Sequence, residues 1–218
     1  MPVTSPLPLD DESLSKAIFA LAAGKLVILP TDTVYGIAAD ARRDRAVSAI
    51  LAAKHRPQSM PVQLLFSPST DLIGRFAQLS GRVVRIVDAL GPGPWTIVTI
   101  AAPALRSPAT AGGSTIGFRI PDSPHIHRLV ERLGGPVAAS SANLHGEPSP
   151  TTCRDAIRQI GKSCSVALDG GPTEMGRDST VIDCSGNEVR ILREGAVARG
   201  EVARILGLRD IPVLRSVR

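Results

Sequence analysis

The chain has 218 residues, of which 43% are hydrophobic, and a mean hydropathy of +0.12, so it can bury the core of a globular domain. Its 25 basic and 20 acidic residues leave a net charge of +5, which suits a protein that meets anions such as nucleotides or RNA. Only 3% of the residues are aromatic, which argues against a typical RNA-recognition sheet, because such sheets stack bases on aromatic side chains.

Three parts are predicted along the chain: a flexible N-terminal arm over residues 1–9, which is rich in proline, a single domain over 10–208, and a C-terminal tail over 209–218. Apolar periodicity and Gly/Pro breakers predict the elements of the domain. In chain order these are a helix from Asp10 or Asp11 to residue 22, a strand at 26–29, a helix at 45–54, a strand at 62–66, helices at 71–77 and 82–90, strands at 95–101 and 116–120, a helix at 126–133, a strand at 137–140, a helix at 151–160, a strand at 165–168, a hairpin of 180–183 with 189–192, and a helix at 201–206. Because several strands are joined too briefly for parallel crossovers, the predicted fold class is mixed α/β, a twisted mixed β-sheet flanked by helices.

Polar residues follow two of the predicted buried strands. Pro30-Thr31-Asp32-Thr33 comes directly after the first strand, where open α/β sheets present ligands; the alternative is a proline-initiated turn whose Thr and Asp side chains cap the backbone. Ser141-Ala142-Asn143 follows residues 137–140 in the same way. Its small residues either admit a ligand or cap the next segment.

Two basic residues end the second predicted helix. Lys54 lies three and four residues beyond Leu51 and Ile50, so it falls on the apolar, inward face of that helix and needs a partner. Together with Arg56 it would suit a phosphorylated ligand. The alternative is a helix-end lysine stabilised by the helix dipole, with Arg56 in solvent.

Arg119 is the third candidate in the middle of the chain. It alternates with Phe118 and Ile120 and is predicted to face the opposite side of the sheet, where a guanidinium suits a carboxylate or phosphate; it could equally be an ordinary solvent-side arginine. The glycine-bearing stretches 169–172 and 176–180 are interpreted as surface loops, with a mobile lid or an anion-binding nest as the alternative.

Several common sites are absent from the sequence. It contains neither the G-x-x-x-x-G-K-[ST] phosphate loop nor the G-x-S-x-G motif of serine hydrolases, which argues against those two classes. Cys153, Cys164 and Cys184 show no C-x-x-C spacing, so we expect neither disulfides nor a zinc site. No secretory signal and no apolar run of membrane-spanning length occurs, and a cytoplasmic protein with no membrane attachment is expected.

Eight short segments occur together and in a fixed order. They are Pro30-Thr31-Asp32-Thr33-Val34-Tyr35-Gly36, Lys54-x-Arg56-Pro57, Pro92-Gly93-Pro94-x-Thr96, Arg119-Ile120-Pro121, Ser141-Ala142-Asn143, Asp169-Gly170-Gly171, Ser179-Thr180-Val181 and Leu192-Arg193-x-Gly195. The set resembles the YrdC-type threonylcarbamoyl-AMP synthase family over about residues 12–207, and in length the chain resembles its single-domain members, which lack an extra C-terminal domain.

The resemblance implies a YrdC-like catalytic domain with a concave basic cleft, and a nucleotidyltransferase that combines L-threonine, bicarbonate and ATP, with Mg²⁺ accompanying ATP. The products would be threonylcarbamoyl-AMP and pyrophosphate. The former would serve the threonylcarbamoyladenosine modification beside the anticodon of tRNA, through a separate downstream transferase complex. Direct tRNA binding is left open.

The resemblance also implies the roles of individual residues. Those expected to hold threonine are Thr33, Arg119 and Ser179. Those expected to hold the nucleotide are Arg56, Thr115, Ser141, Asn143, Ser149 and Arg193. Lys54 and Arg56 are expected to be catalytic, with Lys54 near the phosphates, and metal ligands are not assigned.

Two departures from the family pattern bear on threonine. This chain has Met60 where many relatives carry a polar residue, and Leu65 where they carry a histidine that would contact threonine. Three hypotheses therefore stand: the synthase, a YrdC/YciO-like paralogue that binds nucleotide or RNA with little or altered synthase activity, and a translation-associated RNA-binding module.

Overall fold

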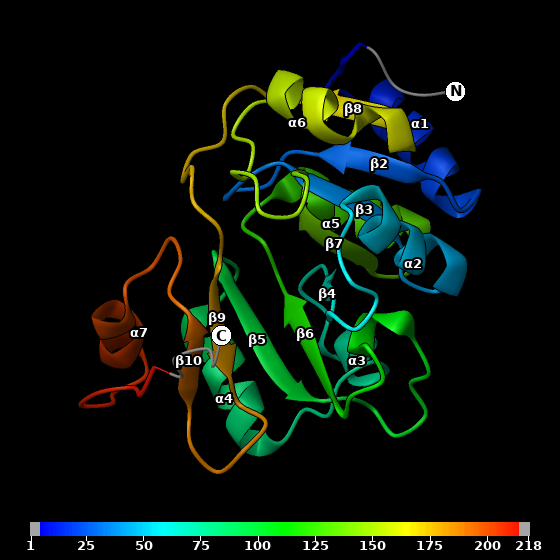
Figure 1. The fold of residues 1–218 in the computed structure, drawn as a ribbon. Coiled ribbons are helices and arrows are strands. Elements are labelled where there is room, and N and C mark those ends of the chain that lie inside the picture. The colour runs from blue at the N-terminus through cyan, green and yellow to red at the C-terminus, as the bar shows by residue number, and fades with distance from the viewer. Residues whose placement is uncertain (1–4, 214–218) are drawn as a thin grey trace.

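The computed structural model describes residues 5–213, in which ten strands form one mixed sheet with helices on both faces (Figure 1). The strands are β1 (Leu7–Pro8), β2 (Leu26–Leu29), β3 (Gly36–Asp40), β4 (Gln63–Leu65), β5 (Trp95–Ile100), β6 (Thr115–Arg119), β7 (Val137–Ser141), β8 (Cys164–Asp169), β9 (Thr180–Asp183) and β10 (Arg190–Arg193). The helices are α1 (Asp11–Ala22), α2 (Asp44–Ala53), α3 (Thr70–Gly74), α4 (Gly81–Leu90), α5 (Pro124–Leu133), α6 (Cys153–Ile160) and α7 (Arg199–Ile205). The predicted fold class is confirmed.

The strand order is β1-β8-β2-β3-β7-β4-β6-β5-β9-β10. Neighbouring strands joined by short connections, such as β2 with β3 and β9 with β10, pair antiparallel. The pair β9 and β10 is the predicted hairpin. The pairs β2 with β8, β4 with β6 and β5 with β9 are parallel and need longer crossovers. The segment between β8 and β9 runs from one part of the sheet to the other (Figure 1).

Alternation along the strands assigns the two faces of the sheet. On one face the residues Ile28, Ile37 and Ala138 pack with α2 and α6 in a core that continues to α4. On the other face Val27 and Ala38 pack against α1 and α5 in a second core. The sheet is therefore the middle of three layers where it carries helices on both sides.

On the second face, the residues stop packing in a core and begin to line a cavity at β4. Leu65 belongs to the core beneath α1 and α5, whereas Gln63, two residues earlier on the same face, lines a cavity instead. Thr96, Gly117 and Val181 continue this cavity floor on β5, β6 and β9. A concave site thus begins where the α1/α5 layer stops.

Three local differences from the expected elements have simple causes. Strand β3 was not predicted, because its sequence Gly-Ile-Ala-Ala-Asp has little β-branched character. Leu7–Pro8, inside the predicted flexible arm, forms β1 against β8; a proline is tolerated there because β1 is an edge strand. Within the predicted tail, Ile211 is fully buried and Pro212 accepts a hydrogen bond from Ile191.

The predictions for residues 1–4 and 214–218 lie outside the described residues. None of the helices in the described part of the chain is long and apolar enough to cross a membrane.

Candidate functional site

The cavity floor is part of a cavity of about 320 Å³, a size within the range of small-molecule sites. Seven of the residues that were assigned roles line it: Thr33, Arg56, Thr115, Arg119, Ser141, Ser179 and Arg193. Three others do not: Lys54, Asn143 and Ser149. Thr115 and Arg119 share one face of β6 four residues apart, which separates their Cα atoms by about 13 Å. The cavity is therefore long enough to hold two parts of a ligand.

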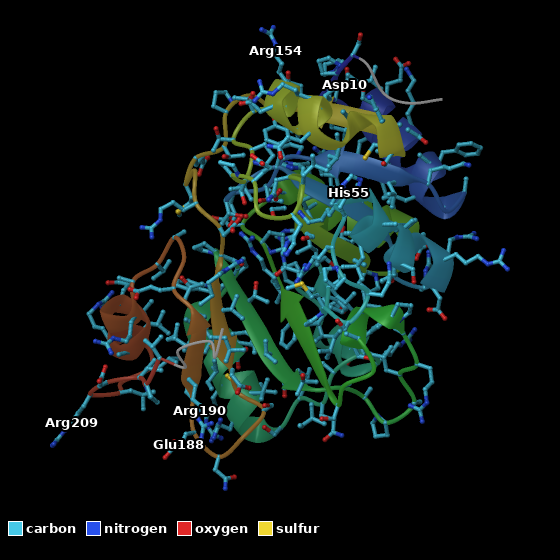
Figure 2. The ribbon with its side chains drawn as sticks, in the orientation of Figure 1. Asp10, His55, Arg154, Glu188, Arg190 and Arg209 are labelled. Carbon is cyan, nitrogen blue, oxygen red and sulfur yellow. The ribbon has the colours of Figure 1, made fainter. Side chains whose placement is uncertain are left out.

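Arg56 reaches the cavity because of the way α2 ends. The backbone N–H of Arg56 donates to Leu51 and that of His55 donates to Ala52, which is the Schellman pattern. The motif requires a left-handed residue, and His55 adopts it with φ 52°, at the bend labelled in Figure 2. The chain then turns back, and the partly buried Arg56 faces the cavity. Burial and the nearby Arg193 lower the pKa of Arg56.

Lys54 lies behind the cavity wall. It is only 3% exposed, as expected from its place on the inward face of α2. Its Nζ donates to the backbone oxygens of Ser141 and Asn143, at 2.5 and 2.6 Å, and to Asn143 Oδ1 at 3.0 Å. These are the three bonds that an ammonium group can make. The geometry therefore joins the Lys-x-Arg and Ser-Ala-Asn segments, with Lys54 holding the second in place.

Arg119 is buried and faces the cavity, as its alternation with Phe118 predicted. Its Nη2 pairs with Asp32 Oδ1 at 2.5 Å, its Nη1 donates to Thr33 Oγ1 at 2.8 Å, and its Nε donates to Gly93 O at 3.0 Å. Burial lowers the pKa of Arg119, while Asp32 opposes that shift. Three of the five N–H groups are used, so two remain for a ligand carboxylate.

Asp178 links Ser149 to Arg193 at the edge of the cavity. Its carboxylate accepts a hydrogen bond from Ser149 Oγ at 2.9 Å and lies 3.4 Å from Arg193 Nη1. Arg193 Nη2 in turn donates to Ser179 O at 2.8 Å. Ser149 thus contacts the site through Asp178 and does not line the cavity itself.

Gly195 is required for the close approach of two backbone segments. A Cβ at this position would overlap the backbone of Asp178 and Ser179, so we expect Gly195→Ala to destabilise the fold by about 1–3 kcal/mol and to displace Ser179. Urea unfolding would measure this. Gly186→Ala is the matched control, because a Cβ at Gly186 meets no atom within 4 Å; equal stability of the two variants would contradict the expectation.

Within the described residues no group of three or more His, Cys, Asp or Glu side chains could hold a metal ion. The acidic residue among those lining the cavity is Asp178. One carboxylate suits a Mg²⁺ ion that is held mainly by phosphate oxygens and water.

Comparison with known proteins shows the family of the chain. The family model for Sua5, YciO and YrdC proteins, described as "Telomere recombination", matches residues 20–195. The chain belongs to this family. A Mycobacterium tuberculosis protein provisionally named threonylcarbamoyl-AMP synthase is 38% identical over 192 residues, which cover 88% of each chain. The threonylcarbamoyl-AMP synthase of Bacillus subtilis is 32% identical over 206 residues, 94% of this chain and 60% of that protein.

Solved structures of the family have the same fold. Sua5 of P. abyssi complexed with L-threonine superposes with a TM-score of 0.89 and 29% identity over 98% of this chain. The chain spans 62% of that longer protein. YciO of E. coli, with 20% identity and a TM-score of 0.78, supports the fold alone.

Four residues of this family member's site were not assigned a role from the sequence: Asp32, Gln63, Thr96 and Asp178. Asp32 and Asp178 directly precede Thr33 and Ser179 and could have been found as their neighbours. Thr96 belongs to the segment Pro92-Gly93-Pro94-x-Thr96 but was given no role, and Gln63 lies outside the eight segments. The position of both on the cavity face depends on the register of β4 and β5 with β6.

Proposed function

We propose that this protein is an L-threonylcarbamoyladenylate synthase, which forms threonylcarbamoyl-AMP and pyrophosphate from L-threonine, bicarbonate and ATP. The observation that carries the proposal is a single cavity lined by Arg56, Arg119 and Arg193 together with the hydroxyls of Thr33 and Ser179. Such a cavity offers cations for phosphate and carboxylate groups and polar atoms for a small amino acid. The relatives that carry the same activity in their names support it.

The reaction joins three substrates in two bond-forming steps. The amino group of threonine and bicarbonate give a carbamate and water, and a carbamate oxygen then attacks the α-phosphorus of ATP while pyrophosphate leaves. Negative charge grows on the transferring group and on the leaving group. Fixed guanidinium groups stabilise that charge without forming a covalent bond to the protein.

In the proposal, one group of residues holds threonine and another holds the nucleotide. Arg119, Thr33 and Ser179 hold threonine, and the two unused N–H groups of Arg119 suit its carboxylate. Arg56, Thr115, Ser141 and Arg193 hold the nucleotide. Asn143, Ser149 and Lys54 act on the nucleotide side indirectly, through the hydrogen bonds that fix Ser141 and Asp178.

Mg²⁺ is proposed to arrive with ATP, where it would neutralise phosphate charge, and Asp178 is the cavity carboxylate that could contact it or its water shell. The proposal also includes a cytoplasmic location and delivery of the product to tRNA through a separate transferase complex. It does not require the chain itself to bind tRNA.

Pyrophosphate release tests the function directly. We expect it to need threonine, bicarbonate and ATP together, with omission of any one reducing it to background. Detection of threonylcarbamoyl-AMP by mass spectrometry identifies the product. Release that persists without threonine or bicarbonate would contradict the proposal and favour a paralogue with altered activity.

Arg56→Ala should lower that activity by about 10² to 10³, the usual effect of removing one group that stabilises transition-state charge. The fold should remain, because the contact recorded for this side chain within the described residues is Met60 Sδ at 3.1 Å. Thermal melting checks this. Arg154→Ala is the matched control, since Arg154 is an exposed arginine of α6 that points away from the molecule (Figure 2); equal loss in both variants would remove Arg56 from the site.

A further inference from the structure

Three side chains on the cavity floor form a continuous hydrogen-bonded chain. Thr96 Oγ1 lies 2.5 Å from Gln63 Oε1 and 2.8 Å from Ser179 Oγ. Thr96 and Ser179 are almost fully buried, at 4% and 3% exposure, and all three residues line the cavity. These hydrogen bonds link β4, β5 and the residue that precedes β9.

Counting hydrogens fixes the direction of this chain. Gln63 Oε1 can only accept, so the single hydroxyl hydrogen of Thr96 points to Gln63. Thr96 therefore accepts in its contact with Ser179, and the hydroxyl hydrogen of Ser179 points to Thr96. Ser179 then has only lone pairs left to offer. One of them faces Arg193 Nη2 at 3.4 Å, and the other is available to a ligand.

The two ends of the chain consequently have opposite character. Ser179 Oγ presents an acceptor. Gln63 Nε2 presents donors, because no protein partner of this atom is recorded within the described residues and Gln63 is half-buried at the cavity. A ligand hydroxyl is the group that matches both ends, since it can donate to Ser179 and accept from Gln63 at once.

The floor beside these side chains is open. Gly117 on β6 lies between them, and a Cβ there would meet Thr96 Cγ2 at 3.4 Å and Gln63 Cβ at 3.7 Å. These are ordinary contact distances, so a group the size of a methyl fits above Gly117 in contact with both side chains. This space is available to a small group that reaches the floor.

We propose that Gln63 is a specificity-determining residue, and that the chain Gln63–Thr96–Ser179 recognises the side-chain hydroxyl of the amino-acid substrate. This inference rests on the proposed function, which places threonine at Ser179. In the bound state the ligand hydroxyl closes a ring of hydrogen bonds, each hydroxyl donating once and accepting once. Such a site rejects an isostere without the hydroxyl, because Gln63 Nε2 and Ser179 would lose their partner.

Calorimetric titration of threonine and valine separates the two proposals, because it does not depend on turnover. The wild-type protein should bind threonine and prefer it to valine. Gln63→Leu should weaken threonine binding about tenfold, the effect of one lost hydrogen bond, and leave valine binding within about twofold.

Thr96→Val tests the chain as a unit. Valine has nearly the shape of the Thr96 side chain but no hydroxyl, so this variant interrupts the hydrogen-bonded chain. The preference for threonine over valine as ligand should fall by a similar factor. The double variant Gln63→Leu/Thr96→Val should be no worse than the worse single one, because both break the same network. Gln78→Leu is the matched control: Gln78 is exposed and its Nε2 makes a long contact with Ala101 O at 3.5 Å.

Each outcome has a distinct meaning. If the wild type does not bind threonine, the proposed function fails and this inference falls with it. If the wild type prefers threonine but Gln63→Leu keeps that preference, only the inference is overturned. Equal weakening of threonine and valine in Gln63→Leu, with melting unchanged, would place Gln63 at another part of the amino acid and likewise overturn it.

Discussion

Arg119→Lys is expected to weaken threonine binding by about a hundredfold or more, while ATP binding changes by no more than about twofold. The guanidinium of Arg119 contacts Asp32, Thr33 and Gly93, which leaves two of its five N–H groups unused, and Arg119 lines the cavity. A lysine ammonium is a point charge with three donors and cannot keep these contacts while binding a carboxylate through two parallel bonds. Two lost charge-assisted bonds account for the size of the effect.

Separate calorimetric titrations with threonine and with an ATP analogue measure this difference. Arg128→Lys is the matched control, because Arg128 forms an exposed ion pair with Asp11 at 3.0 Å that contributes little. A threonine affinity in Arg119→Lys equal to that of the wild type would exclude Arg119 from carboxylate recognition. Loss of both ligands would show that Arg119 mainly supports the loops around Asp32.

Lys54→Met is expected to destabilise the fold by about 3 kcal/mol and to abolish most of the activity. The replacement leaves three acceptors on Ser141 and Asn143 without a donor, two of them buried and one partly buried, at about 1 kcal/mol or more each. Because Ser141 lines the cavity, the loss also changes the nucleotide side of the site. The variant should therefore differ from Arg56→Ala, which loses activity but keeps its stability.

Urea unfolding of Lys54→Met beside Lys16→Met measures the effect, since Lys16 forms an exposed pair with Glu12, whose loss should change stability little. Normal stability of Lys54→Met would contradict the supporting role that the hydrogen bonds indicate. Normal activity would remove Lys54 from the site altogether.

The same lysine should make stability depend on pH. Burial, with a smaller effect of Arg56, lowers the pKa of Lys54 from 10.5 to about 8. Between these values the unfolded chain holds a proton that the folded chain has lost, so the contribution of Lys54 to stability rises as pH increases from 8 towards 10.5. The difference in unfolding free energy between the wild type and Lys54→Met should therefore grow across this range, by up to about 3 kcal/mol. A constant difference would contradict the lowered pKa.

The sequence predicted the parts of the site that depend on local periodicity. The inward position of Lys54 followed from the spacing of α2, and the cavity-facing position of Arg119 from alternation along β6. The partners of these residues could not be predicted, because Asp32 lies 87 positions from Arg119 in the chain and Asn143 lies 89 positions from Lys54. Gln63 and Thr96 were missed for the same reason: strand register, which a single sequence does not reveal, sets their place on the cavity floor.

The order of strands also has a consequence for how the protein folds. Contacts that complete the cavity, such as Thr33 with Arg119 and Thr96 with Ser179, join residues 86 and 83 positions apart, so loop closure opposes them until the intervening chain is in place. The hydrogen bonds within the helices join residues four positions apart, so they can form earlier. Recovery of ligand binding should accordingly lag behind recovery of helical signal during refolding, and a chain nicked between β8 and β9 would keep much of its core while losing the cavity.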